Sequence, residues 1–152
     1  AATSAKSGKA SKRDSSSAGQ KAKRTGIWAK IMTKWFITYS NKGRKKWHFV
    51  SFEGRRGGES TGVVDFIAIR RNHHAKTRLF AAGDRFQIIL IQVKGGGSKS
   101  PSQKDVKRLQ RVKKYHHANR VLLSTWEKGK PIKLHELRGN DWINTTPTKA
   151  FK

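Results

Sequence analysis

Two apolar runs, at residues 62–70 and 86–94, form the strongest hydrophobic pattern along the chain. Runs of Val, Ile, Leu and Phe that are bounded by glycine and charge predict central strands covered on both faces of a sheet. Asp65 lies within the first run, and Gln92 and Lys94 close the second. An unpaired ion inside a core costs several kcal/mol, so these polar groups need partners. We therefore expect the two strands to lie side by side, with the three groups meeting at one end of the sheet.

The alternation of side chains along a strand predicts which of these residues share a face of the sheet. Successive residues of a strand point to opposite faces, so Gln92 and Lys94 share one face. Together with Asp65 they form a candidate site for a divalent cation, because carboxylate and amide oxygens are ligands that Mg²⁺ accepts.

The remaining periodicities predict an α/β domain over residues 27–137. A four-residue repeat predicts a first helix over 27–40, with its large apolar residues, Trp28 and Trp35 among them, on the packing face. Further strands are expected at 46–53, 120–126 and 132–137. Ser102, with Asp105 three positions later, predicts the start of a second helix. The expected order is helix, three strands, helix and two strands.

The two ends of the chain predict less order. Residues 1–26 carry no large apolar side chain and are rich in Lys, Arg, Ser and Ala, so we expect a disordered basic arm. A solubilising tail and an organelle transit peptide are the alternatives for this segment. Residues 138–152 are expected to form an irregular C-terminal tail.

The charge of the chain indicates its class of partner. The formal net charge is +26, from 35 Lys and Arg against nine Asp and Glu, which implies a polyanionic partner. DNA is the favoured partner, RNA is the alternative, and an anionic membrane surface is a weaker candidate. No segment approaches the roughly 20 apolar residues of a membrane span. The absence of cysteine excludes disulfides, zinc fingers and thiol chemistry. With no secretory signal either, the expected location is cytoplasmic and nucleoid-associated.

The element order, with an acid in the second strand and a Gln-x-Lys triplet ending the third, resembles the PD-(D/E)XK nuclease superfamily. The stretch 57–94 is most similar to the catalytic domains of Mrr-type restriction endonucleases, where a glycine-rich turn precedes the aspartate. The resemblance implies a restriction-endonuclease-like α-β-β-β-α-β core, with a mixed central sheet flanked by helices, and Mg²⁺- or Mn²⁺-dependent cleavage of DNA. It also implies that Asp65 ligates the metal, that Gln92 takes the place of a second acid, and that Lys94 lies at the attacking water.

One departure from the superfamily concerns the first helix, which often carries another acid. Residues 27–40 contain neither Asp nor Glu. Glu59, in the glycine-rich turn, is the preferred substitute, and Glu53 is the alternative. The expected metal ligands are thus Asp65, Gln92 and Glu59, and the catalytic residues are these three with Lys94.

Basic residues near the turn and on the second helix are the expected nucleic-acid contacts: Arg55, Arg56, Lys99, Lys104, Lys107, Arg108 and Arg111. The glycines at 95–97 either leave room for the substrate backbone beside Lys94 or form a flexible turn. Because cutting both strands takes two sites, a homodimer is a further expectation. The competing function is a non-catalytic nucleic-acid-binding protein, chromosome- or ribosome-associated, on a degenerate nuclease fold. In that case Asp65 and Lys94 would form a buried ion pair.

Overall fold

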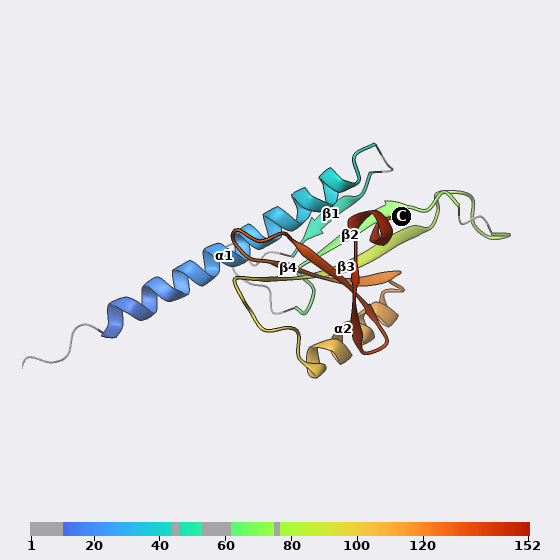
Figure 1. Ribbon diagram of the computed structural model, residues 1–152. Coiled ribbons are helices and arrows are strands. Elements are labelled where there is room, and N and C mark those ends of the chain that lie inside the picture. The colour runs from blue at the N-terminus through green and yellow to red at the C-terminus, as the bar shows by residue number, and fades with distance from the viewer. Residues whose placement is uncertain (1–10, 44–45, 53–61, 75–76) are drawn as a thin grey trace, which may run out of the picture.

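The computed structural model describes residues 11–43, 46–52, 62–74 and 77–152, which form a six-stranded mixed sheet with helices on both faces (Figure 1). Helix α1 (Ser11–Ser40) covers one face, and α2 (Gln103–Tyr115) covers the other. A short helix, α3 (Pro147–Ala150), ends the chain. The strands are β1 (His48–Ser51), β2 (Phe66–Arg71), β3 (Phe86–Gly95), β4 (Arg120–Trp126), β5 (Lys133–Arg138) and β6 (Asp141–Thr145).

The strands lie in the sheet in the order in which they follow along the chain. Strands β3 and β4 pair in parallel and are joined by α2, and every other neighbouring pair is antiparallel. The predicted α/β class and mixed sheet are therefore confirmed. Strands β2 and β3 are neighbours, with Phe66 opposite Ile91, as the two apolar runs predict. Strand β2 begins at Phe66, however, so Asp65 precedes the strand instead of lying within it.

Period two along β3 divides the core between the two faces of the sheet. Ile89 and Ile91 pack with Ile37 of α1 in one cluster, whereas Leu90 packs with Leu109 of α2 in the other. This alternation confirms that β3 is a central strand covered on both sides. Gln92 and Lys94, two and four residues after Leu90, share one face of the strand near its end.

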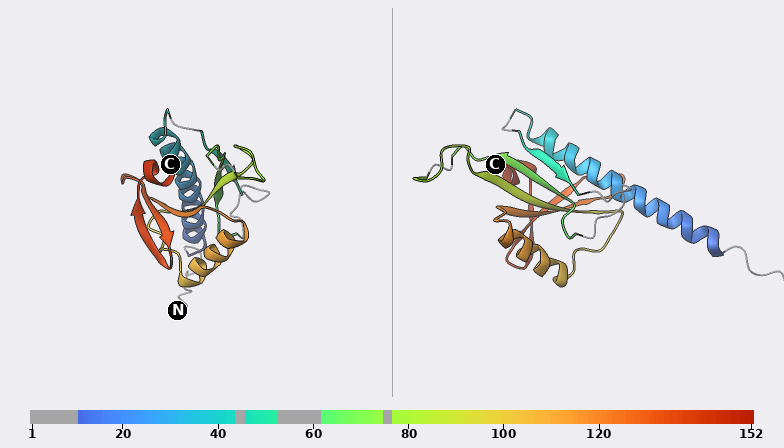
Figure 2. Two further views of the ribbon diagram at one scale, coloured as in Figure 1. Left: turned by 90° about the vertical axis from the view of Figure 1, so that its right-hand side faces the viewer. Right: turned by 180° about the vertical axis from the view of Figure 1, so that it is seen from behind.

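Helix α1 differs from the prediction at its start. It begins at Ser11, so the expectation of a disordered arm over 1–26 is wrong for 11–26, while residues 1–10 lie outside the described part. The N-terminal half of the helix extends past the sheet (Figure 2). Once residues 27–40 are packed, each further residue adds a helical hydrogen bond without a new nucleation cost, and Ala, Lys, Arg and Gln favour the helix. Polar composition therefore did not prevent helix formation.

The buried face of α1 also differs from the prediction. The fully or almost fully buried residues of α1 are Ala29, Thr33 and Ile37, and Trp28 and Trp35 point to solvent. Thr33 Oγ1 lies 2.7 Å from Ser124 Oγ on β4, and both hydroxyls are buried. The expected placement of the two tryptophans in the core is thus wrong.

The C-terminal segment is ordered, contrary to the expected irregular tail. Strand β6 pairs with β5 through a tight turn, with Arg138 opposite Asp141 and Gly139 at a φ of 59°. Gly-Asn between two strands is a recognised hairpin signal that the sequence contains at this turn. Beyond it, Phe151 is buried on the α1 side, where its carbonyl oxygen accepts a hydrogen bond from Trp47 Nε1 at 3.2 Å.

Among the helices of the described residues, none combines the length and the hydropathy that crossing a membrane requires.

Candidate functional site

A cleft of about 640 Å³ lies at the end of the sheet where β2 begins and β3 ends, and Asp65, Gln92 and Lys94 all line it. The register of β2 and β3 explains this placement, because Phe66 pairs with Ile91 and so leaves Asp65 beside Gln92. Helix α1 forms the opposite wall, to which Lys23, Gly26, Ile27 and Lys30 contribute. The convergence of the three polar groups, which the sequence predicts, is confirmed.

Asp65 is held firmly by its backbone and its side chain. Its N–H donates to the carbonyl of Ile91 at 3.0 Å, and its own carbonyl accepts from the N–H of Phe52 at 3.1 Å. The carboxylate atom Oδ2 accepts a hydrogen bond from the N–H of Val93 at 2.7 Å. Asp65 thus bridges the ends of β1 and β3, and its carboxylate is fixed at the mouth of the cleft.

The other carboxylate oxygen, Oδ1, lies 3.1 Å from Nζ of Lys30 on α1. Both side chains are mostly buried, at 18% and 22% exposed for Lys30 and Asp65. The binding-only alternative expected an ion pair between Asp65 and Lys94, but the structure pairs Asp65 with Lys30 instead. Sequence reasoning missed Lys30, because only the packing of α1 brings this lysine to the cleft.

Gln92 supplies the second candidate ligand. It is 7% exposed, and its carbonyl oxygen has no hydrogen-bond partner within the described part of the chain. Asn41 Oδ1, His135 Nδ1 and Trp142 Nε1 are also buried without a partner in the described part of the chain, and Gln92 differs from them in lining the cleft beside Asp65. A bound water or a bound ion satisfies an atom of this kind. The carboxylate of Asp65 and the amide oxygen of Gln92 are hard ligands of the kind that Mg²⁺ and Mn²⁺ take. The residues therefore fit a divalent cation.

Lys94 lies on the same face of β3 as Gln92 and borders two hollows at this end of the sheet. The smaller hollow, of about 170 Å³, is also bordered by Trp126 and Lys133. Its charge reaches the start of α2: hydrogen bonds from Ser102 lower the pKa of Asp105, and the positive charge of Lys94 contributes to the same shift. The lysine therefore lies where an anion entering the cleft would meet it.

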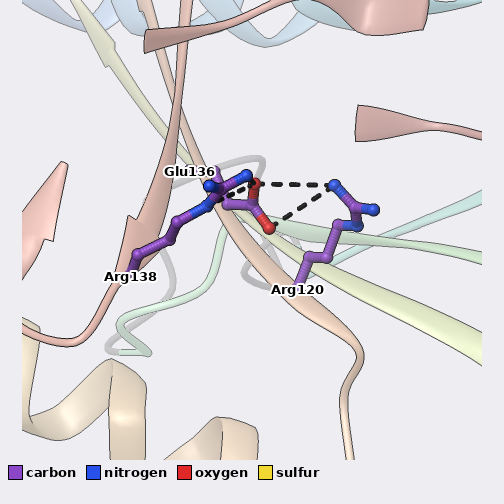
Figure 3. Close-up of polar contacts among 3 residues, drawn as sticks. All are labelled: Arg120, Glu136 and Arg138. Atoms are coloured by element: carbon purple, nitrogen blue, oxygen red, sulfur yellow. Dashed lines mark hydrogen bonds and ion pairs between the residues drawn. The ribbon is translucent and has the colours of Figure 1, made fainter. Parts of the chain in front are cut away.

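Three other carboxylates near the sheet already have partners. Glu136 on β5 binds the guanidinium groups of Arg120, at 3.4 Å, and Arg138, at 2.9 Å (Figure 3). Asp105 completes the capping box of α2, and Glu127 pairs with Lys130 at 2.8 Å. The described residues contain no group of three or more His, Asp or Glu side chains that could hold a metal ion by themselves. Asp65 is the one carboxylate that lines the cleft in this part of the chain.

Three predicted site residues, Glu59, Arg55 and Arg56, lie outside the described residues, as does the alternative ligand Glu53. The other predicted nucleic-acid contacts are exposed: Lys99 follows the cleft residue Ser98, and four more lie on α2, namely Lys104, Lys107, Arg108 and Arg111.

Two of the three glycines after Lys94 serve the packing of α1. A Cβ atom at Gly95 would lie 2.9 Å from Cβ of Ala29, and one at Gly96 would lie 2.8 Å from Cγ2 of Thr25. The expectation that these glycines leave room for substrate is therefore wrong for Gly95 and Gly96, because α1 occupies that space. Gly97 has nothing within 4 Å of its Cβ position and a φ of 73°.

Comparison of the chain with models of protein families, with curated proteins and with solved structures found no match. The molecule is an α/β protein with a basic cleft at one end of a mixed sheet.

Proposed function

We propose that this protein is a metal-dependent endonuclease of the PD-(D/E)XK type that hydrolyses phosphodiester bonds in DNA. The observation that carries the proposal is the convergence of Asp65, Gln92 and Lys94 on one cleft, where the Gln92 carbonyl oxygen lacks a hydrogen-bond partner among the described residues. The order α1-β1-β2-β3-α2-β4 supports it, because the resemblance to that superfamily implies the same order. The net charge of +26 supports a polyanionic substrate.

The chemistry assigns a separate task to each side chain. Asp65 and Gln92 would hold Mg²⁺ or Mn²⁺, which when bound neutralises the scissile phosphate and activates water. Lys94 donates hydrogen bonds to the attacking water and to the phosphate oxygens, where negative charge grows in the transition state. The N–H of Val93 keeps the Asp65 carboxylate in one orientation throughout, since it holds Oδ2 at 2.7 Å.

Lys30 has a part in this scheme as well. Its ammonium group balances the carboxylate of Asp65 at 3.1 Å. Each carboxylate oxygen has two lone pairs, so Asp65 can accept from Lys30 and Val93 and still ligate a cation. When substrate enters, Lys30 is positioned to bind the phosphate group beside the carboxylate.

The competing function, nucleic-acid binding without cleavage, also has an observation in its favour. The described residues that line the cleft include Lys23, Lys30 and Lys94 but a single carboxylate, Asp65, and Lys30 already pairs with it. A cleft with this balance of charge attracts phosphate whether or not it holds a metal. An assay of cleavage separates the two functions.

The test is a plasmid-nicking assay with Mg²⁺ or Mn²⁺. Asp65→Asn and Lys94→Ala should each slow nicking by about 100-fold or more. The matched control is Lys149→Ala, which removes a positive charge from α3 and should leave nicking unchanged. Undiminished nicking by Asp65→Asn would refute the assigned site. Binding of DNA and RNA by all four proteins, without cutting of either, would establish the competing function.

A further inference from the structure

The outward face of α1 carries a row of large apolar side chains that are not packed into the core. Each is at least 44% exposed, and together they make up what we call the apolar stripe: Ile27, Trp28, Ile31, Trp35 and Tyr39. Their spacing of three and four residues places them on one side of the helix, opposite the buried Ala29, Thr33 and Ile37. A contiguous exposed row of this kind is typical of a binding surface.

Two rings of the apolar stripe form a flat platform. The ring centroids of Trp35 and Tyr39 are 5.2 Å apart, and their planes differ by 11°. Both side chains remain open to solvent, at 56% and 63% exposed. Such a pair leaves an aromatic face available for another planar ring, as in surfaces that bind nucleic-acid bases.

The charge around the apolar stripe determines the kind of occupant. The same side of α1 continues toward the N-terminus with Arg24 and Lys21, at helical spacing from Trp28. The sequence contains no Asp or Glu from residue 15 to residue 52. A second copy of this chain would bring the same positive surface against it and be repelled, whereas an anionic strand would be attracted. The surface therefore fits a partner that has both planar rings and negative charge.

The apolar stripe also continues into the cleft. Ile27 belongs to the stripe and lines the cleft that contains Asp65 and Lys94. From there the stripe follows α1 to Tyr39, about 18 Å along the axis at about 1.5 Å per residue. A strand whose phosphate lies in the cleft can thus run along α1 without leaving the protein surface.

We propose that the apolar stripe binds the unpaired bases of a nucleic-acid strand that enters the cleft, so that the preferred substrate contains a single-stranded segment beside a duplex. This inference rests on the proposed function in requiring that the cleft binds DNA. It adds the structural class of the substrate and assigns Trp35 and Tyr39 as the stacking residues.

The test compares binding of two labelled DNAs by fluorescence anisotropy: a blunt duplex, and a fork with the same duplex and two unpaired arms. The wild-type protein should bind the fork more tightly. Trp35→Ala and Tyr39→Ala should each weaken fork binding by about 5- to 100-fold, since each removes a stacking surface. Affinity for the blunt duplex should stay within a factor of about two. Trp35→Phe should retain most of the fork affinity, because it keeps an aromatic face.

Phe86→Ala is the matched control. Phe86 is 55% exposed, close to the value for Trp35. It lies two residues before Ile88 in β3 and therefore on the same face, which is the α2 side. Its removal should leave binding of both DNAs unchanged.

Three results would overturn the inference. If the two alanine variants bind the fork as tightly as the wild type while nicking persists, the stripe has no role in stacking and the proposed function stands. If the wild type binds neither DNA, the proposed function fails together with the inference. If sedimentation velocity shows a dimer that Trp35→Ala converts to a monomer, a second copy of the chain is the occupant.

Discussion

Replacement of Lys30 by methionine tests the ion pair that holds α1 against the candidate metal ligand. At the observed 3.1 Å, the Coulomb attraction is about 5 kcal/mol at an effective dielectric constant of about 20, before the cost of desolvation is subtracted. Exposed pairs contribute about 0–1 kcal/mol, and breaking a buried pair costs about 3–5 kcal/mol. Lys30 and Asp65 lie between these limits, at 18% and 22% exposed. We therefore expect Lys30→Met to lower the free energy of unfolding by about 1–3 kcal/mol.

The assay is urea unfolding of the wild type, Lys30→Met, Asp65→Asn and the double variant. The double-mutant cycle should give a coupling energy of about 1–3 kcal/mol between the two residues. Lys21→Met, an exposed change on the same helix, should shift stability by less than about 0.5 kcal/mol. Mn²⁺ should bind Lys30→Met more tightly than the wild type, because the positive charge of the ammonium group no longer repels the cation. A coupling energy near zero, with unchanged Mn²⁺ affinity, would refute this account of the pair.

Three further predictions concern the packing and pH dependence of the fold. Gly95→Ala should cost about 1–3 kcal/mol and lower Tm in calorimetry, because its Cβ would lie 2.9 Å from Ala29; an unchanged Tm would contradict that close approach. Asp105→Asn should cost about 0.5–1 kcal/mol in urea unfolding at pH 7. Since hydrogen bonds from Ser102 lower the Asp105 pKa, this difference should persist above pH 3.8 and vanish as the pH falls through the lowered pKa. Burial lowers the pKa of His135, so the unfolded chain binds a proton at this histidine more readily than the folded protein does, and the free energy of unfolding should fall below pH 6.5. His135→Gln should reduce that fall in urea unfolding. A pH profile identical to that of the wild type would exclude the histidine as its source.

Five of the six strands could be predicted from the sequence because their signals are local, whereas β6 lies in the segment that was expected to be irregular. The apolar runs of β2 and β3 and the capping box at Ser102 and Asp105 each depend on a few adjacent residues, and the structure contains them close to the predicted positions. Period two then assigned Gln92 and Lys94 to one face of β3. The helix predicted between the third and fourth strands is α2, which joins the parallel pair β3 and β4.

The orientation of α1 could not be predicted in this way. The helix has two competing faces, and the larger apolar residues, including Trp35, lie on the one that stays exposed. The buried face contains Ala29 and Thr33, whose small side chains allow close approach to Gly95 and Gly96 at the end of β3. Steric complementarity between segments far apart in the chain decided which face of α1 was buried. The hydrophobic pattern of the helix alone does not predict this.

The candidate site was predicted only where it depends on strand pairing and not where it depends on the packing of α1. Asp65, Gln92 and Lys94 lie on neighbouring strands, so strand pairing alone brings them together. The contact between Lys30 and Asp65 depends on how α1 packs against the sheet. The sequence showed that the first helix lacks an acid, but it did not indicate that a lysine of this helix would pair with Asp65.

The catalytic role of the cleft is tested by the single-turnover rate of cleavage of fully bound, end-labelled DNA, measured against Mg²⁺ concentration for the wild type and Asp65→Asn. Because all the DNA is bound, the rate reports catalysis and not affinity. We expect a rate that saturates with Mg²⁺, is abolished by a chelator, and falls by about 100-fold or more in Asp65→Asn. A wild-type protein that holds the DNA without cutting it at any Mg²⁺ or Mn²⁺ concentration would contradict the claim that this cleft is catalytic.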